Sequence, residues 1–214
     1  MSVTLFATII SIVALVTCRP LTLASRLSSV PLYQHLFFGA TAIVALIWSL
    51  KYTPHPLLTI HFLCATTLTL LLGARLALMS LALVILIFLL TTGAGLNSWG
   101  LSFVIWGIIP VTFSRASLLL SQKFLPRHLF IYLLVNGFIT GALAILLTLI
   151  AQYLAFIWIT GGDWQSQLTY LNVTPLLMFP EGLLNGMAIT LLAVYKPHWL
   201  KTYDDRIYLN EGKD

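Results

Sequence analysis

Long apolar stretches separated by short polar segments are the feature that most constrains how this chain can fold. The hydrocarbon core of a bilayer is about 30 Å thick, so one helical crossing needs roughly 20 apolar residues. Stretches of about that length follow one another along the whole sequence. We therefore expect about seven transmembrane helices, at residues 3–18, 33–50, 57–74, 76–92, 101–121, 129–159 and 173–196.

The charge content also indicates a membrane protein. Only 8% of the residues are charged, whereas a soluble domain carries about 25%. So few charges cannot cover a surface that faces water, and lipid must therefore be the solvent. We predict an all-α polytopic membrane bundle in which residues 1–214 form a single integral membrane domain and residues 197–214 form a short cytoplasmic tail. The expected location is a lipid bilayer.

Lysine and arginine residues are distributed unevenly between the loops, and this sets the expected orientation. Basic residues concentrate in the cytoplasmic loops of membrane proteins. With seven crossings, only Lys51 falls on one side, while Arg115 lies within a span. The other nine basic residues fall on the opposite side: Arg19, Arg26, Arg75, Lys123, Arg127, Lys196, Lys201, Arg206 and Lys213. The N-terminus is therefore predicted outside and the C-terminus in the cytoplasm. Cations scattered through short loops do not indicate a nucleic-acid partner.

The last apolar stretch carries two polar residues near its middle, Glu181 and Asn185. Acidic residues at this depth are costly to bury, and they usually have a function or a partner. Asn185 follows Glu181 by four residues, so both lie on one helix face. Arg115 is the obvious partner, because it is the basic residue that lies deep in a predicted span. We predict a structural Glu181–Arg115 ion pair, with direct contact to a substrate as the alternative.

Two Gly-x-x-x-Gly patterns occur in the last two predicted spans, at Gly137 and Gly141 and at Gly182 and Gly186. Membrane helices associate through small residues, because lipid provides no hydrophobic drive between them. Such patterns are also frequent by chance in membrane helices. The two faces therefore either bring helices into close contact or have no role in packing.

Histidine and cysteine residues near the third predicted span are candidate metal ligands. His61 and Cys64 are three residues apart and would share one face of a helix, and His55 lies just outside the span. Imidazole and thiolate suit soft or borderline metals such as nickel, cobalt, copper or zinc. The alternative for His61 is a hydrogen-bonded histidine between helices, which the spacing alone favours. His35 and His128 are expected at the membrane interface, as is Trp48 at the end of its span.

The motifs of several enzyme classes are absent from the sequence. It contains no Gly-x-x-x-x-Gly-Lys-[Ser/Thr], no Gly-x-Ser-x-Gly and no His-Glu-x-x-His. We therefore expect neither an enzyme nor a tightly bound cofactor, and any ATP hydrolysis would have to come from another chain.

Two segments carry a resemblance to a known family. The C-terminal one, Phe179–Leu209, reads FPEGLLNGMAITLLAVYKPHWLKTYDDRIYL. The other, Thr59–Leu78, reads TIHFLCATTLTLLLGARLAL and contains a histidine followed by small residues. Both are similar to segments of the CbiM-like permeases, the substrate-specific components of energy-coupling-factor ABC transporters for cobalt and nickel. The resemblance covers most of the chain and implies a location in the inner membrane of a bacterium.

The resemblance implies a membrane subunit that captures a divalent metal ion, cobalt or nickel, near its outer face. Separate ATPase and coupling membrane subunits would drive release of the ion into the cell. In such proteins the ion is held by the N-terminal amine, a histidine at position 2 and a later histidine, which His61 matches. Ser2 stands at position 2 of this chain. Either Cys64 or His55 supplies other ligands, or the cargo differs.

Two functions follow from these patterns. The first is a permease subunit for uptake of a transition-metal ion. The alternative is a non-transporting membrane scaffold or assembly factor, in which the Glu181–Arg115 pair locks helices together.

Overall fold

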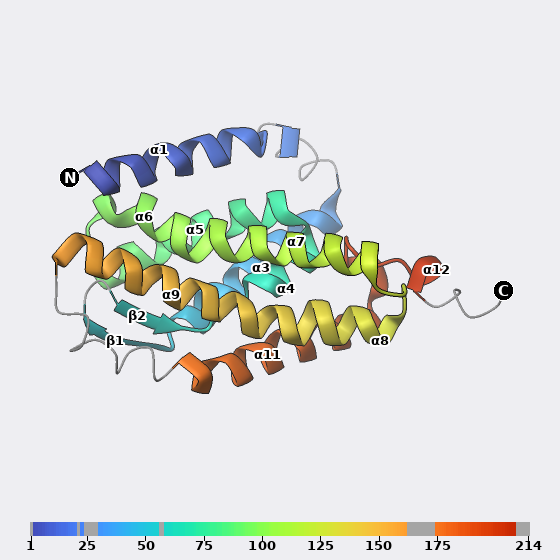
Figure 1. The fold of residues 1–214 in the computed structure, drawn as a ribbon. Helices are drawn as coiled ribbons and strands as arrows, with labels where there is room; N and C mark the ends of the chain where they lie inside the picture. Colours follow the sequence, from blue (N-terminus) through green and yellow to red (C-terminus); the bar gives the residue numbers. More distant parts are fainter. Residues whose placement is uncertain (1, 21, 24–29, 56–57, 162–173, 209–214) are drawn as a thin grey trace.

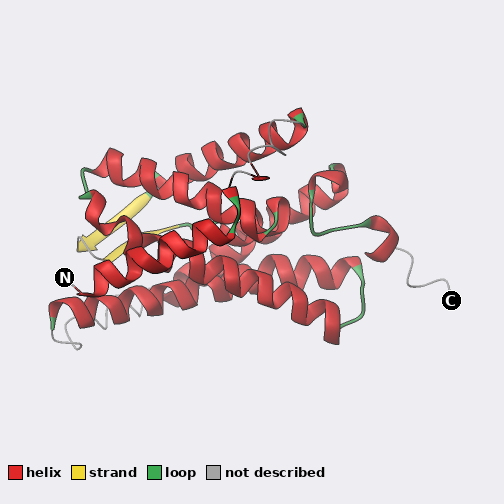
Figure 2. Cartoon of the chain, turned by 90° about the horizontal axis from the view of Figure 1, so that it is seen from above, coloured by secondary structure: helices red, strands yellow, loops and turns green. Residues whose placement is uncertain are grey.

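The computed structural model describes residues 2–20, 22–23, 30–55, 58–161 and 174–208. These residues form an elongated bundle of helices, with a small two-stranded hairpin at one end (Figure 1, Figure 2). The first helix, α1 (Ser2–Thr17), begins at the hairpin end, and the last long helix, α11 (Thr174–Tyr195), finishes at the opposite end (Figure 1).

Several helical segments are long and apolar enough to cross a membrane. Among the described residues there are five: α3 (Pro31–Trp48), α5 (Ala74–Thr92), Leu96–Phe124, Leu129–Thr160 and α11. They coincide in position with the predicted spans at 33–50, 76–92, 101–121, 129–159 and 173–196. The predicted span at 3–18 corresponds to α1, which is apolar but shorter. A helical membrane bundle is thus confirmed, while the count of seven crossings and the orientation of the termini stay predictions.

The two longest segments are composite. The first consists of η1 (Leu96–Ser98), α6 (Trp99–Phe103), η2 (Val104–Ile108) and α7 (Ile109–Phe124). The second consists of α8 (Leu129–Ile131), η3 (Tyr132–Ile139) and α9 (Thr140–Thr160). Both η2 and η3 are π-helical turns, a form that often occurs at functional sites. After α11 the tail contains only two short helices, η4 (Pro197–Trp199) and α12 (Asp205–Tyr208).

The predicted third span, residues 57–74, is not a continuous helix, and this part of the prediction was wrong. The chain runs through the strand β2 (Leu58–His61), an irregular turn, and the short helix α4 (Ala65–Leu72). Gly73 then ends α4 with a positive φ of 78°, a conformation that favours glycine. The interrupted crossing is possible because distant residues provide partners for its backbone, as shown below.

A two-stranded hairpin precedes the interrupted crossing. The strand β1 (Lys51–His55) pairs antiparallel with β2, and the register places Lys51 opposite His61 and Tyr52 opposite Ile60. Directly opposed residues of an antiparallel pair project to the same face of the sheet. Lys51 and His61 are therefore neighbours on one face of the hairpin.

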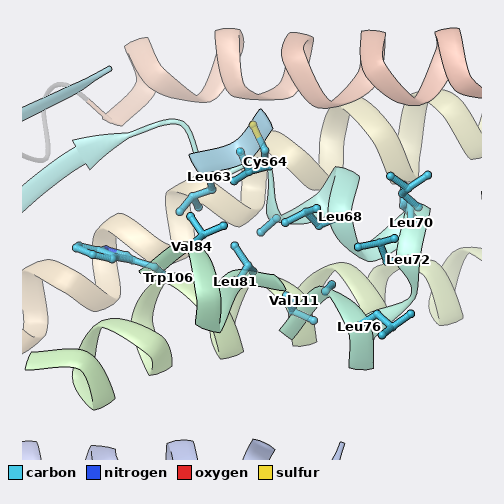
Figure 3. Close-up of a cluster of buried hydrophobic side chains, with 14 of the residues drawn as sticks. Leu63, Cys64, Leu68, Leu70, Leu72, Leu76, Leu81, Val84, Trp106 and Val111 are labelled. Carbon is cyan, nitrogen blue, oxygen red and sulfur yellow. The ribbon is translucent and has the colours of Figure 1, made fainter. Parts of the chain in front are cut away.

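The helix α4 is enclosed by protein. Every residue of α4 except Thr67 is buried. In Figure 3 its leucines pack among Leu81 and Val84 of α5 and Val111 of α7, which are all fully buried. Non-helical backbone at membrane depth is tolerated only where protein or a water-filled cavity surrounds it. The interruption at residues 62–64 is consistent with this rule, because it lies against other helices.

The outward faces of the long helices are apolar. Leu46 on α3, Leu90 on α5 and Phe179 on α11 are 71%, 63% and 75% exposed, respectively. A water-soluble bundle would place polar side chains at such positions. This surface therefore fits the lipid environment expected from the composition.

The two Gly-x-x-x-Gly faces pack against each other where α11 meets η3 and α9. A Cβ atom on Gly182 would lie 2.8 Å from the carbonyl oxygen of Phe138, and one on Gly137 would lie 3.2 Å from the Cα of Gly186. A Cβ on Gly141 would lie 3.0 Å from the side chain of Asn185. Close helix contact at both patterns is thus confirmed, and it brings α11 near enough to reach α4.

Candidate functional site

Glu181 is buried on α11 and binds the irregular turn that leads into α4. Its carboxylate accepts hydrogen bonds from the backbone amides of Leu63 and Cys64, at 2.9 and 2.8 Å. Cys64 has a φ of 53°, a strained conformation for a residue other than glycine. The two hydrogen bonds hold the turn in this conformation. The carboxylate also lies at the N-terminal end of α4, where the helix dipole favours a negative charge.

Asn185 continues this contact one turn further along α11. Its side-chain oxygen accepts hydrogen bonds from the backbone amide and the hydroxyl of Thr67, at 2.9 and 2.8 Å. Its side-chain nitrogen donates to the Glu181 carboxylate at 2.7 Å. The first amides of a helix have no partner within the helix. The Glu181–Asn185 pair therefore provides, from another helix, the acceptors that a continuous third span would have provided itself.

Arg115 is not the partner of Glu181, and the predicted ion pair is wrong. Arg115 is exposed on α7, whereas Ser114 and Leu118 of the same helix are buried. The helix thus turns Arg115 away from the interior, and no ion pair joins these two described residues. Hydrogen bonds from backbone amides also stabilise a buried carboxylate. The prediction considered only side-chain partners.

The opposite end of α4 is held by the tail that follows α11. The hydroxyl of Thr202 donates to the carbonyl oxygen of Leu70 at 2.8 Å. The backbone amide of Lys201 donates to the carbonyl oxygen of Leu71 at 3.0 Å. These carbonyls belong to the last turn of α4, where no amide within the helix is available. Thr202 also contacts the hydroxyl of Tyr132 at 2.8 Å, which joins the tail to η3.

His61 is buried in an aromatic cage, which we define as Trp48, Phe88 and Trp106. The ring centroid of His61 is 3.9 Å from that of Trp48, 5.0 Å from Trp106 and 5.8 Å from Phe88. The indole nitrogen of Trp48 also donates to the carbonyl of Leu63 at 3.3 Å. The turn at residues 62–64 is therefore bound by the cage on one side and by Glu181 on the other.

The two nitrogens of His61 have different environments. Nδ1 lies 3.2 Å from the carbonyl oxygen of Phe62, and this contact requires Nδ1 to carry the proton. Nε2 is then a lone-pair nitrogen, and it has no hydrogen-bond partner among the described residues. With its proton on Nδ1 and a lone pair on Nε2 the ring is neutral, the form that binds metals.

A cavity of about 450 Å³ lies beside the aromatic cage, and Phe88 and Trp106 line both. Lys51 lines it as well, with its ammonium 4.4 Å from the centre of the Phe88 ring. Thr59 and Gln152 contribute polar atoms to its wall and are both buried. No Asp, Glu, His or Cys occurs among the described residues that line it. The cavity thus offers aromatic, hydroxyl and amide groups with one positive charge.

Comparison with known proteins identifies the family. The family model for CbiM, described as the cobalt uptake substrate-specific transmembrane region, matches residues 1–199. The chain belongs to the CbiM family. The match includes the hairpin, the cage and the Glu181–Asn185 pair, and it ends before Lys201. No curated protein and no solved structure matches the chain.

Membership of the CbiM family establishes the general role. The family consists of transmembrane components of cobalt uptake, which agrees with the helices long enough to cross a membrane. The protein is therefore a multi-pass inner-membrane protein that belongs to a transporter family, not to an enzyme family.

Two of the three predicted metal ligands, His61 and Cys64, have different surroundings in the structure. His61 faces the cage, whereas Cys64 lines a separate cavity of about 440 Å³ with Leu68 and Ala188. His55 pairs with Leu58 at the turn end of the hairpin, its side chain lies outside the described part of the structure, and its role as a ligand stays a prediction. Among the described residues, no group of three His, Cys, Asp or Glu side chains could hold a metal ion.

The set of ligands that the CbiM-like resemblance implies is also incomplete. Ser2 replaces the histidine at position 2, and Met1, which would provide the amine, lies outside the described residues. His61 is the candidate that the structure places suitably, because its Nε2 is buried and unpartnered. His128 instead accepts a hydrogen bond from the amide of Phe130 at the start of α8, and His35 is exposed on α3.

Sequence reasoning missed the cage and the tail contacts. Trp48 was expected at the membrane interface, but it is only 1% exposed and packs on His61. Trp106 and Phe88 carried no signal, because aromatic residues in an apolar helix are usually core residues. One signal could have indicated the hairpin that carries His61. The sequence between Lys51 and Ile60 contains two prolines and β-branched residues, which disfavour a helix.

Proposed function

We propose that this protein is the substrate-binding membrane subunit of a transporter that takes up a transition-metal ion of the cobalt or nickel type. The observation that carries the proposal is the buried, unpartnered Nε2 of His61 in a chain of the CbiM family. A neutral imidazole is a good ligand for cobalt and nickel. A buried polar atom without a partner is rare in proteins and calls for a ligand, a water or an ion.

The position of His61 supports a role in capture from outside the cell. His61 lies at the hairpin end of the bundle, opposite Lys51. The unequal distribution of basic residues predicts that this end faces outward. Release on the inner side would require partners, because the sequence contains no phosphate-binding loop. We propose separate ATPase and coupling membrane subunits for this step.

The proposal can be tested by the metal content of the protein purified without a polyhistidine tag. The wild type and a His128→Ala variant should retain cobalt or nickel after dialysis, whereas His61→Ala should lose most of it. His128 is a suitable control because it is exposed and caps α8. If the wild type retains no more metal than an unrelated membrane protein, the transport proposal fails.

A non-transporting scaffold remains the second candidate, and one observation favours it. The carboxylate of Glu181 and the amide of Asn185 are fully used in holding α4. In a scaffold, substitution of His61 would leave cellular cobalt uptake unchanged, and every uptake defect would parallel a loss of stability. A His61→Ala variant that is stable in detergent but inactive in uptake would exclude this candidate.

A further inference from the structure

An apolar groove lies between α3 and α11. It is the cavity of about 440 Å³ that Cys64 lines, with α3 as one wall, α11 as the other and α4 as its floor. Apart from His35, Cys64 and Thr67, the residues that line it are glycine, aliphatic or aromatic. A Cβ atom on Gly39 of α3 would meet no atom within 4 Å, and Ile43 is 59% exposed. The groove is therefore open to the surroundings of the bundle, and the described part of this chain does not fill it.

The groove has about the depth of one leaflet of a bilayer. Its floor covers residues 64–71 and its α11 wall residues 184–192, which at about 1.5 Å per residue are roughly 10 and 12 Å long. The α3 wall, residues 32–47, is roughly 22 Å long. Half of the hydrocarbon core is about 15 Å, whereas a transmembrane helix of another protein would need a complementary face along about 30 Å. A lipid acyl chain, which spans one leaflet, fits these dimensions.

A positive charge lies at the end of the groove that is nearest the tail. Leu192 and Trp199 line this end, and the amide of Lys196 donates to the carbonyl oxygen of Leu192 at 2.8 Å. The Lys196 side chain is exposed, and its ammonium lies 5.8 Å from the centre of the Trp199 ring. No Asp or Glu occurs among the described residues that line the groove. Tryptophan is enriched at the level of the lipid headgroups, and lysine at this level attracts anionic lipids.

We propose that the groove binds an anionic phospholipid from the leaflet on the side of the tail. One acyl chain lies between α3 and α11 and packs on Leu71 of α4, and the phosphate lies beside Lys196. The distribution of basic residues predicts that this leaflet is the cytoplasmic one, where anionic lipids attract basic segments. The site takes a lipid and not the cargo, so it does not depend on the proposed function.

The test measures lipid binding to the detergent-solubilised protein by native mass spectrometry. The delipidated protein is titrated with phosphatidylglycerol, which is anionic, or with phosphatidylcholine of the same acyl chains, which has no net charge. We expect one phosphatidylglycerol to bind about fivefold more tightly, the factor that one lysine near an anionic lipid provides. The Lys196→Gln variant should lose this preference, and Lys196→Arg should keep it.

The matched control for the headgroup contact is Lys123→Gln. Lys123 is also exposed, its ammonium also lies near an aromatic ring, 5.2 Å from the centre of Phe124, and it does not line the groove. This variant should bind phosphatidylglycerol with the same preference as the wild type.

A second variant, Gly39→Leu, tests the position of the acyl chain. The leucine extends into the open space of the groove and should weaken binding of both lipids about tenfold, because it displaces the equivalent of about two methylene groups of the chain. Ala42→Leu is the matched control, because Ala42 is exposed on α3 but does not line the groove. It should bind both lipids as the wild type does.

The lipid proposal is overturned if the wild type binds the two lipids equally, or if Lys196→Gln changes the preference no more than Lys123→Gln does. It is also overturned if Gly39→Leu leaves lipid binding unchanged. A dimer in the same spectra that Gly39→Leu abolishes without a change in bound lipid would assign the groove to a second copy of the chain instead.

Discussion

The two ends of α4 are both held by the C-terminal part of the chain, but by different chemistry. At its start, two side chains of α11 accept hydrogen bonds from three backbone amides. At its end, one hydroxyl and one backbone amide of the tail donate to two carbonyls. The first set is buried and includes a carboxylate, whereas Thr202 and Lys201 are partly or fully exposed.

This difference indicates that the start of α4 matters for both stability and the site, and the end mainly for closure of the fold. The turn at residues 62–64 directly follows His61, so its position depends on Glu181. Thr202 is at the other end of α4, away from the cage. The family match also includes Glu181 and ends before Thr202.

The largest effect is expected from Glu181→Ala. The change leaves the amides of Leu63 and Cys64 buried without their acceptor, and each such group costs about 1–3 kcal/mol. We expect the free energy of unfolding in detergent to fall by about 3 kcal/mol or more. Arg115→Leu is the matched control and should change it by about 0.5 kcal/mol or less.

A double variant separates the present arrangement from an ion pair. If Glu181 were paired with Arg115, changing both to leucine would restore stability, because a buried ion pair can be replaced by apolar residues. The amide contacts predict instead that Glu181→Leu with Arg115→Leu is as unstable as Glu181→Leu alone. Recovery in the double variant would contradict the observed role of Glu181.

An intermediate effect is expected from Asn185→Ala. The Thr67 amide loses its acceptor and Glu181 loses one donor, which should lower the free energy of unfolding by about 1–2 kcal/mol. Chemical denaturation in detergent measures this value. If Asn185→Ala lowered the free energy of unfolding as much as Glu181→Ala, the two residues would act as one unit. The expected ranking, with the larger loss for Glu181→Ala, would then be wrong.

The smallest effect is expected from Thr202→Val. The change removes two hydrogen bonds, to Leu70 and to Tyr132, but Thr202 is partly exposed and water can replace part of them, so the loss should be about 1 kcal/mol. Thr202→Ser keeps the hydroxyl and should retain wild-type stability. Since Thr202 is far from the cage, both variants should retain as much cobalt as the wild type. Loss of cobalt in Thr202→Val, but not in Thr202→Ser, would mean that the far end of α4 also controls the site.

Much of the bundle could be predicted from the sequence, because the length of an apolar stretch is a local property of the chain. Each apolar stretch of sufficient length predicts a helix, and five of them coincide with helices of the required length. The shared face of Glu181 and Asn185 also follows from helical spacing, and their hydrogen bond confirms it. The glycine patterns were found for the same reason, although only the structure shows that the two faces meet.

The interrupted crossing could not be predicted in this way because its partners are far away in the sequence. Leu63 and Cys64 give up helical hydrogen bonds, and the acceptor that replaces them is on α11. No local pattern around residue 60 contains this information. The partners of Glu181 were missed for the same reason. Its carboxylate binds backbone amides, which every residue except proline has, so no residue type in the sequence marks them.

The distance along the chain between α4 and its partners has a consequence for biosynthesis. The acceptor for the amides of Leu63 and Cys64 is 118 and 117 residues further on, and Thr202 is 132 residues beyond Leu70. The ribosome therefore delivers the interrupted crossing to the membrane long before α11 has been translated. During that interval the turn has to remain where water or the insertion machinery solvates it, and the bundle can close only after the final helix arrives.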